Sequence, residues 1–172
     1  MARAVLGGGC FWCVEGAFKG IIGVESVNPG YSGGLEPNPS YESICSGTTG
    51  HAEVVEILFD ETQISFETIL EVFFTVHNPT QLNRQGNDVG TQYRSVIFYL
   101  DEIQKQVAER IIEEIGECFD DDIVTEISPL KLFYKAEIAH HDYFAKNPQN
   151  PYCQMVVAPK LRTLRAKLSH LY

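Results

Sequence analysis

The stretch Gly7-Gly8-Gly9-Cys10-Phe11-Trp12-Cys13 carries the residues best suited to chemistry, a cysteine behind three glycines and ahead of two aromatic rings. The residues before it, Arg3–Leu6, are predicted to form a short strand, and Val14–Phe18 has the apolar spacing of a helix. A cysteine at that junction lies at a helix N-terminus, where free N–H groups and the macrodipole favour the thiolate. We therefore interpret Cys10 as a reactive thiol. The alternative is a buried structural cysteine, which is the commoner role.

Length and composition narrow the class of protein. The chain of 172 residues, 44% hydrophobic and 21% charged, is typical of a single globular domain, so we expect one catalytic domain over residues 1–172. Its net charge of −10 argues against binding to nucleic acid, which needs a basic face. No signal peptide and no apolar run of about 20 residues stands out. We expect a cytosolic monomer, without membrane association, whose five cysteines are mostly reduced and partly redox-active.

The elements that must position Cys10 follow from hydrophobic periodicity. Strands are predicted at Arg3–Leu6, Val24–Val27, Ala52–Phe59, Arg94–Leu100 and Val124–Ile127. Helices are predicted over 66–74 with Ser65 as N-cap, over 103–115 with Asp101 as N-cap, and over 161–171. Long segments rich in glycine, proline and amides, 28–41, 77–93 and 147–154, are interpreted as ordered loops that line a site. Irregular alternation of few strands with helices favours a two-layer α+β sandwich over a doubly wound sheet.

Five short segments occur in an informative order. They are Gly9-Cys10-Phe11-Trp12-Cys13, Gly30-Tyr31-Ser32-Gly33-Gly34 leading to Asn38-Pro39-Ser40-Tyr41, Gly50-His51-Ala52-Glu53, Gly86-Asn87-Asp88-Val89-Gly90-Thr91-Gln92-Tyr93-Arg94-Ser95, and Asn150-Pro151-Tyr152-Cys153. From Gly7 to about Lys160 the chain resembles the peptide methionine sulfoxide reductases of the A class, which reduce the S epimer of methionine sulfoxide. The resemblance implies a ferredoxin-like core wrapped by long loops, and neither a metal nor an organic cofactor.

Reduction of a sulfoxide needs a nucleophile for sulfur and a proton donor for the departing oxygen. Cys10 supplies the nucleophile and becomes a sulfenic acid. Glu53 begins a hydrophobic strand, where burial would raise its pKa, although a surface carboxylate at a strand edge is the local alternative. The resemblance implies that Glu53 is the donor and that Tyr41 and Tyr93 hydrogen-bond the sulfoxide oxygen. It implies a supporting role for Asp88, which by itself would be a turn residue.

The two aromatic residues after Cys10 are candidates for substrate binding. Phe11 and Trp12 would form an apolar wall for the methyl group of the substrate beside a polar oxygen site. Exchange of methyl and oxygen would place each in the wrong surroundings, which accounts for selection of one epimer. The alternative for both rings is ordinary core packing.

The sulfenic acid must be resolved by a second thiol and then reduced from outside. Cys153 is our first choice, because the resemblance implies a C-terminal resolving cysteine and the prolines around it oppose a helix and predict a mobile segment. Cys13 lies one helical turn from Cys10 and could resolve instead or act in a relay, although glycine is commoner there in the family. The resemblance implies thioredoxin as reductant and oxidised proteins, peptides or free methionine sulfoxide as substrates. Cys45 and Cys118 are interpreted as structural or incidental.

Two other classes of function compete with this interpretation. A zinc-binding module would need paired ligand spacings, but the chain has a single Cys-x-x-Cys and adjacent His140 and His141. A general dithiol oxidoreductase working through Cys10 and Cys13 would need neither Glu53 nor the tyrosines. The histidines at positions 51, 77, 140 and 141 receive no role from the sequence.

Overall fold

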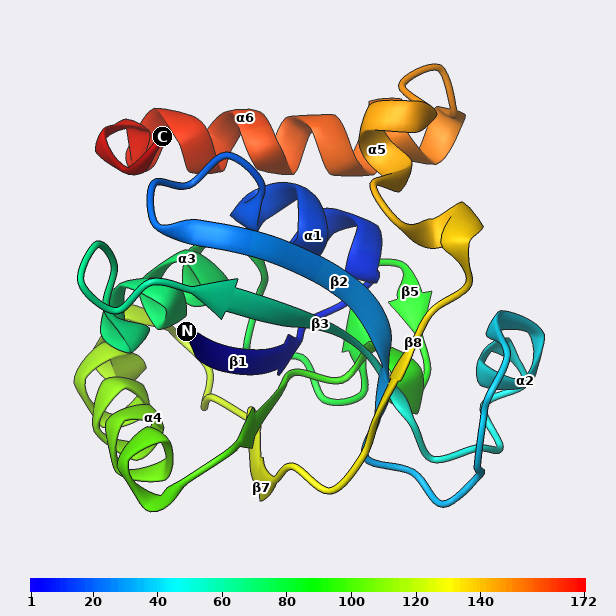
Figure 1. Ribbon diagram of the computed structural model, residues 1–172, viewed down its shortest axis with the longest axis horizontal. Helices are drawn as coiled ribbons and strands as arrows, with labels where there is room; N and C mark the ends of the chain where they lie inside the picture. The colour runs from blue at the N-terminus through cyan, green and yellow to red at the C-terminus, as the bar shows by residue number, and fades with distance from the viewer.

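The computed structural model describes all residues from Met1 to Tyr172, and Figure 1 shows a curved mixed sheet with helices packed against it. The strands are β1 (Ala2–Gly7), β2 (Val24–Ser32), β3 (Ala52–Phe59), β4 (Arg84–Gln85), β5 (Asp88–Val89), β6 (Val96–Tyr99), β7 (Glu126–Pro129) and β8 (Phe133–Lys135). The helices are α1 (Phe11–Phe18), α2 (Tyr41–Cys45), α3 (Phe66–Val76), α4 (Glu102–Ile115), α5 (Tyr143–Lys146) and α6 (Ala158–Lys167).

The main sheet has the order β7-β6-β1-β3-β2-β8, and β4 and β5 form a separate hairpin. Its four central strands are antiparallel and are connected as β1-α1-β2-β3-α3-β6. This is the split βαβ arrangement of ferredoxin-like folds, which confirms the expected α+β class. β7 extends the sheet in parallel beside β6, and β8 pairs with the end of β2.

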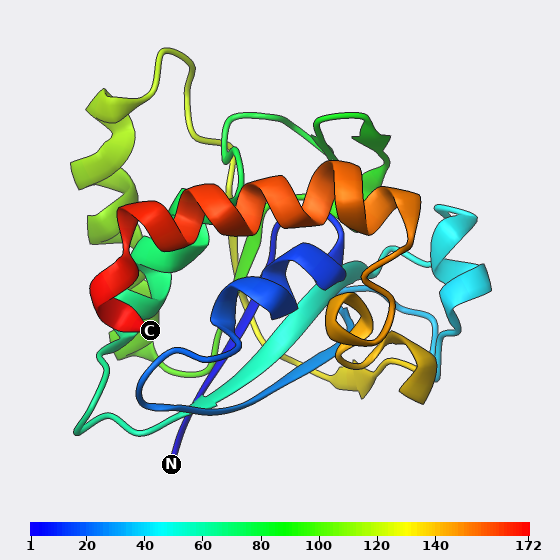
Figure 2. The same ribbon diagram turned by 90° about the horizontal axis from the view of Figure 1, so that it is seen from above.

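Side chains of β3 alternate between two buried faces, and this alternation decides where its acid points. Val55 and Ile57 face the larger core, which contains 30 buried residues and is shared with α1, α3 and α6. Ala52 and Val54 belong to a smaller cluster on the opposite face. Because the period of a strand is two, Glu53 shares the face of Val55 and points towards α1. Figure 2 shows α6 crossing above α1 on this side of the sheet.

Local capping signals place two helices as expected. The Ser65 hydroxyl accepts a hydrogen bond from the Thr68 N–H at the start of α3, and Asp101 accepts one from the Gln104 N–H at the start of α4. β3 has its expected bounds, whereas the strand predicted over 94–100 is confined to β6 and that over 124–127 is shifted to β7. The last predicted helix ends at Lys167 and is followed by a 3-10 turn over Ser169–Leu171.

Two expectations about loops were wrong. Residues 28–32 belong to β2 rather than to a loop, because β3 and β8 pair with this end of β2 on its two sides. The segment 147–154 becomes helical at Pro151 and continues through a π-helical turn, Cys153–Val157, into α6. Pro151 occupies the first helical position, where its missing N–H has no partner to lose, so it starts this helix instead of opposing it.

The helices are short compared with the thickness of a bilayer. None of them is both long enough and apolar enough to cross a membrane.

Candidate active site

Cys10 lies between β1 and α1, where two glycines let other segments come close. A side chain at Gly8 would collide with the His77 ring, and one at Gly9, where φ is +85°, would collide with Gln85. The Gly9 N–H donates a hydrogen bond of 3.2 Å to the Tyr93 carbonyl oxygen. Cys10 is the N-cap residue of α1, as expected, and is 7% exposed.

Glu53 reaches α1 from β3 and is 1% exposed. Its Oε1 accepts a hydrogen bond of 3.2 Å from the Phe11 N–H, the first N–H of α1, so this carboxyl takes the position of a capping group. Its Oε2 is buried and has no hydrogen-bond partner in the protein. Burial raises the pKa of Glu53 to about 8, against the smaller opposing effect of the Phe11 N–H. The expected burial is present, and the acid holds a proton at neutral pH.

The thiol of Cys10 differs from the expectation of a thiolate. Burial, the Glu53 carboxylate and Cys13 raise the pKa of Cys10 well above its usual range. The Trp12 backbone N–H lowers the pKa of Cys10, but its effect is smaller than that of burial. Cys10 does lie at a helix N-terminus, which favours the thiolate. Burial and the Glu53 carboxylate have the larger effect and raise the pKa of Cys10.

Tyr41 and Tyr93 come from different segments and are both half-buried. Burial and the Glu53 carboxylate raise the pKa of Tyr41 and the pKa of Tyr93 above their usual range, with a smaller contribution from Cys10 to each. The Tyr41 ring stacks on the Phe11 ring with centroids 6.3 Å apart, and the Tyr93 carbonyl oxygen accepts the Gly9 N–H. Both residues therefore adjoin the start of α1, where Cys10 and Glu53 lie.

Asp88 is joined to a residue to which the sequence assigned no role. Its Oδ2 accepts a hydrogen bond of 2.5 Å from the Tyr152 hydroxyl, across 64 positions of the chain. Burial, followed by Cys10 and Cys13, raises the pKa of Tyr152, so this hydroxyl remains protonated beside both thiols. The only available signal for Tyr152 was its position directly before Cys153.

Trp12 lies in an aromatic cluster that also includes His140, Tyr143 and Tyr152. The Trp12 and Tyr143 rings are stacked, with centroids 3.8 Å apart and planes at 6°, and the Trp12 indole N–H donates to His140 Nδ1 over 3.3 Å. The Tyr152 ring meets the Trp12 ring edge-on at 5.8 Å. Trp12 is half-buried, whereas Phe11 is fully buried beneath Tyr41 and His140. Trp12 is thus the more exposed of the two rings in this aromatic cluster, and its role in substrate binding stays a prediction.

Glu137 is a second residue that the sequence did not reveal. Its carboxylate accepts a hydrogen bond from the Tyr31 hydroxyl and another from the Tyr41 N–H, both of 3.0 Å. Although burial opposes it, the Tyr41 N–H and the Tyr31 hydroxyl help to hold the pKa of Glu137 below its usual range. Glu137 thereby fixes the start of α2, which carries Tyr41.

The two candidate resolving cysteines are both buried. Burial raises the pKa of Cys13 to about 11, Lys160 lowers the pKa of Cys13, and Cys153 raises it further. Cys153 is fully buried at the start of its helix, where the Asn150 carboxamide oxygen accepts hydrogen bonds from the N–H groups of Tyr152 and Cys153. The expected mobile segment around Cys153 is therefore a capped helix start. Cys45 and Cys118 are exposed, and all five thiols are free.

The histidines at positions 51, 77, 140 and 141 all have hydrogen-bond partners in the protein. His77 bonds the Phe73 carbonyl oxygen and the Ser95 hydroxyl, and burial lowers the pKa of His77 to about 4. His51 contacts the loop over 34–36, and His141 bonds the Ala136 carbonyl oxygen. No group of three or more histidine, cysteine or acidic side chains is arranged to hold a metal ion.

Comparisons with known proteins agree with this geometry. The sequence model of the family described as "Peptide methionine sulfoxide reductase" matches residues 2–171. A peptide methionine sulfoxide reductase MsrA of Natronomonas pharaonis is 57% identical over 166 residues, covering 95% of this chain and 93% of the relative. The structure of Mxr1 from Saccharomyces cerevisiae in reduced form superposes with a TM-score of 0.83 at 35% identity, covering 88% of each chain. A structure of Mxr1 in complex with Trx2, 23% identical over 83% of this chain and 84% of that one with a TM-score of 0.58, shares the fold. The chain belongs to the peptide methionine sulfoxide reductase family.

Proposed function

We propose that this reductase acts on methionine-S-sulfoxide through Cys10 as nucleophile and Glu53 as proton donor. One observation carries the assignment. Glu53 Oε2 is a buried carboxyl oxygen without a protein partner, and burial raises the pKa of Glu53 to about 8. A protonated carboxyl beside a buried thiol can donate to a ligand oxygen, as the departure of a sulfoxide oxygen requires.

The reaction reduces the sulfur of the substrate and oxidises the sulfur of Cys10. The Cys10 thiol attacks the sulfoxide sulfur, and Glu53 protonates the sulfoxide oxygen while Tyr41 and Tyr93 donate hydrogen bonds to it. The attack forms an S–S bond between Cys10 and the substrate, and the S–O bond breaks as the doubly protonated oxygen leaves as water. Attack of water on Cys10 Sγ then breaks the S–S bond and releases a proton, so methionine leaves and Cys10 becomes a sulfenic acid. The thiol supplies the second proton of the departing water, and the proton released at the end replaces the one given by Glu53. Asp88, held by Tyr152, supports the polar side of the site.

Stereospecificity follows from the two sides of the site. We propose that the methyl group of the substrate packs on the aromatic wall formed by Trp12 with Phe11 beneath it, while the oxygen faces Glu53. In the R epimer, methyl and oxygen exchange places. The oxygen would then lose its donors and the methyl group would cover a buried carboxyl, at a cost of the kind that unpaired buried polar groups incur.

We propose that the sulfenic acid is resolved through Cys13 and Cys153 in turn. Cys13 lies one turn of α1 after Cys10, with its N–H donating to the Cys10 carbonyl oxygen, and Cys153 is buried in the same core as both. The Cys13 thiol attacks the sulfenic sulfur, water leaves, and a Cys10–Cys13 disulfide forms. Cys153 then attacks Cys13, which frees Cys10 and leaves a Cys13–Cys153 disulfide. A dithiol of thioredoxin would reduce it, in keeping with the complex of the yeast relative with Trx2.

We further propose that residues 1–172 act as one catalytic domain, as a monomer in the cytosol, on peptide-bound and free methionine sulfoxide. The larger core contains side chains from Ala4 near one end of the chain to Leu168 near the other, which supports one domain. Five free cysteines support a reducing compartment. Light scattering of the purified protein measures the oligomeric state.

The deciding experiment is reduction of the separate S and R epimers of methionine sulfoxide with dithiothreitol, by the wild type and by Cys10→Ser. We expect activity on the S epimer alone and none in Cys10→Ser, with Cys118→Ser as the matched control at an exposed thiol. Equal activity on both epimers, or full activity of Cys10→Ser, would contradict the assignment.

A further inference from the structure

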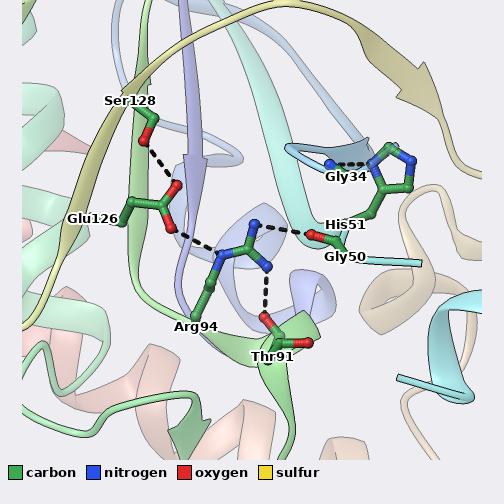
Figure 3. A network of polar contacts seen from close by, with 7 residues as sticks. All are labelled: Gly34, Gly50, His51, Thr91, Arg94, Glu126 and Ser128. Carbon is green, nitrogen blue, oxygen red and sulfur yellow. Dashed lines mark hydrogen bonds and ion pairs between the residues drawn. The ribbon is translucent and has the colours of Figure 1, made fainter. Parts of the chain in front are cut away.

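Arg94 directly follows Tyr93, and its side chain is only 14% exposed. Its guanidinium makes three separate hydrogen bonds. Nη1 donates to the Thr91 carbonyl oxygen over 2.9 Å, Nη2 to the Gly50 carbonyl oxygen over 3.1 Å, and Nε to Glu126 Oε1 over 3.2 Å. Figure 3 shows the planar head of Arg94 between these three acceptors, with Glu126 itself held by the Ser128 hydroxyl.

Two of the acceptors, Thr91 and Gly50, belong to segments that carry the groups proposed to donate to the sulfoxide oxygen. Thr91 begins the 3-10 turn Thr91–Tyr93, and the Tyr93 carbonyl oxygen accepts the Gly9 N–H next to Cys10. Gly50 lies three residues before Glu53. One side chain therefore joins the turn that holds Tyr93 to the chain that leads into β3 and Glu53.

The residue after Gly50, His51, fixes this part of the chain to a second loop. His51 Nδ1 accepts the Gly34 N–H over 3.0 Å, its Nε2 bonds the Glu36 carbonyl oxygen over 2.6 Å, and its own N–H donates to the Thr49 hydroxyl. Figure 3 shows His51 and Arg94 on either side of this turn. With His51 fixed to one loop, the bond from Arg94 to Gly50 is the side-chain link that ties the start of β3 to the Tyr93 turn.

We propose that Arg94 is a positioning residue that sets the separation between the Glu53 carboxyl and the Tyr93 hydroxyl around the sulfoxide oxygen. This inference rests on the proposed roles of Glu53 and Tyr93. Two donors that must reach one small oxygen tolerate little displacement, since a misplacement of about 1 Å can cost a catalytic step about 10²-fold. The three acceptors match a planar guanidinium, whereas the ammonium of lysine is a single point on a flexible stem.

The effect of Arg94 is geometric rather than electrostatic. Burial, the Phe11 N–H and Asp88 determine the pKa of Glu53. The charge of Arg94 is already paired with Glu126. Glu126→Gln keeps an acceptor for Nε, so we expect this variant to retain most of the wild-type rate.

The test is the single-turnover rate of reduction of methionine-S-sulfoxide in Arg94→Ala and Arg94→Lys. In Arg94→Ala we expect the rate at saturating substrate to fall about 10²-fold with little change in KM, because ground-state contacts with the substrate are kept. Added guanidinium should restore part of this loss, and Arg94→Lys should lie between the wild type and Arg94→Ala. Arg110→Ala, at an exposed arginine on α4, is the matched control and should keep the wild-type rate.

A wild-type rate in Arg94→Ala overturns the proposal, as does a loss confined to KM or one that guanidinium does not restore. If Arg94→Ala does not fold, Arg94→Lys decides: a lowered rate at saturating substrate supports the proposal, and a wild-type rate or a loss confined to KM overturns it. The melting temperature of this variant is recorded alongside. Glu53→Gln and Tyr93→Phe are measured in parallel. Wild-type rates in both would defeat the proposed function itself, whereas a slow Glu53→Gln with a fast Arg94→Ala defeats only the role of Arg94.

Discussion

Two helix N-termini in this molecule carry a buried cysteine, and they differ in what faces the thiol. At α1, Cys10 is the N-cap residue and the first N–H of the helix is given to Glu53 from a distant strand. At the helix that begins at Pro151, the neighbouring Asn150 caps the N–H groups, and burial raises the pKa of Cys153.

The comparison shows that a helix N-terminus does not by itself define the chemistry of a cysteine. Both thiols lie at the same end of a helix dipole, and in both helices the first N–H groups are bonded to a side chain. Only the first contains a protonated acid with a free oxygen, so only the first can remove an oxygen atom from a substrate. The second can supply a thiol and nothing more, which suits a resolving role.

The largest expected effect separates the two cysteines completely. Cys153→Ser should release one methionine per enzyme at the wild-type rate but lose cycling with thioredoxin, since the last disulfide cannot form. Mass spectrometry of the oxidised variant should find Cys10 joined to Cys13. Full cycling in Cys153→Ser would show that Cys153 takes no part in resolving the sulfenic acid.

Glu53→Gln tests the feature that distinguishes the first site. Loss of the acid should slow sulfoxide reduction by about 10²- to 10⁴-fold, the usual contribution of general acid catalysis. Since burial raises the pKa of Glu53 to about 8, the wild-type rate should fall as the pH rises through that value. Single-turnover rates between pH 6 and 10 check this, and a decline that persists in Glu53→Gln would have another origin.

The same acid makes the first site sensitive to pH in its stability. The folded protein holds a proton on Glu53 that the unfolded chain loses above its ordinary pKa of about 4.3. The free energy of unfolding should therefore fall as pH rises between that value and about 8, by at most about 1.4 kcal/mol per pH unit. Urea unfolding at pH 5 and pH 8 should show a smaller change in Glu53→Gln than in the wild type.

Trp12 connects the two helix starts through its edge-on contact with Tyr152. Trp12→Ala should lower kcat/KM by about tenfold or more, the usual worth of an apolar contact in a binding pocket. The melting temperature should change much less, because Trp12 is half-buried. Matched losses of stability and kcat/KM would assign Trp12 to packing alone.

The smallest expected effect concerns the second helix start. Asn150→Ala removes a capping oxygen worth about 1 kcal/mol, which should raise the rate of alkylation of Cys153 by about fivefold. Alkylation of Cys10 should not change, because its helix is capped by Glu53. Peptide mapping after timed alkylation measures both rates, and equal acceleration would show that the two starts open together.

Helix caps and strand bounds could be predicted from the sequence, because each depends on residues close together in the chain. The caps at Ser65 and Asp101 and the bounds of β3 follow from neighbouring residues, whereas the burial of Glu53 was left open by them. Period-two alternation along β3 also turns Glu53 towards α1.

The remaining features depend on contacts over long sequence distances. Glu137 reaches Tyr41 across 96 positions, and Tyr152 reaches Asp88 across 64, so no spacing pattern could have revealed either pair. The thiolate expected at Cys10 was wrong for the same reason, because burial and Glu53 lie outside the local pattern. The error at Pro151 was avoidable, since an asparagine directly before a proline is a recognised way to begin a helix.

The glycines before Cys10 limit how this protein can evolve. Alanine at Gly8 would have to displace the ring of His77, and alanine at Gly9 would have to displace Gln85 and adopt a left-handed backbone. Each position is therefore tied to a different distant residue, and neither can drift without a compensating change elsewhere. The run that looks like a flexible linker in the sequence is among the least replaceable parts of the chain.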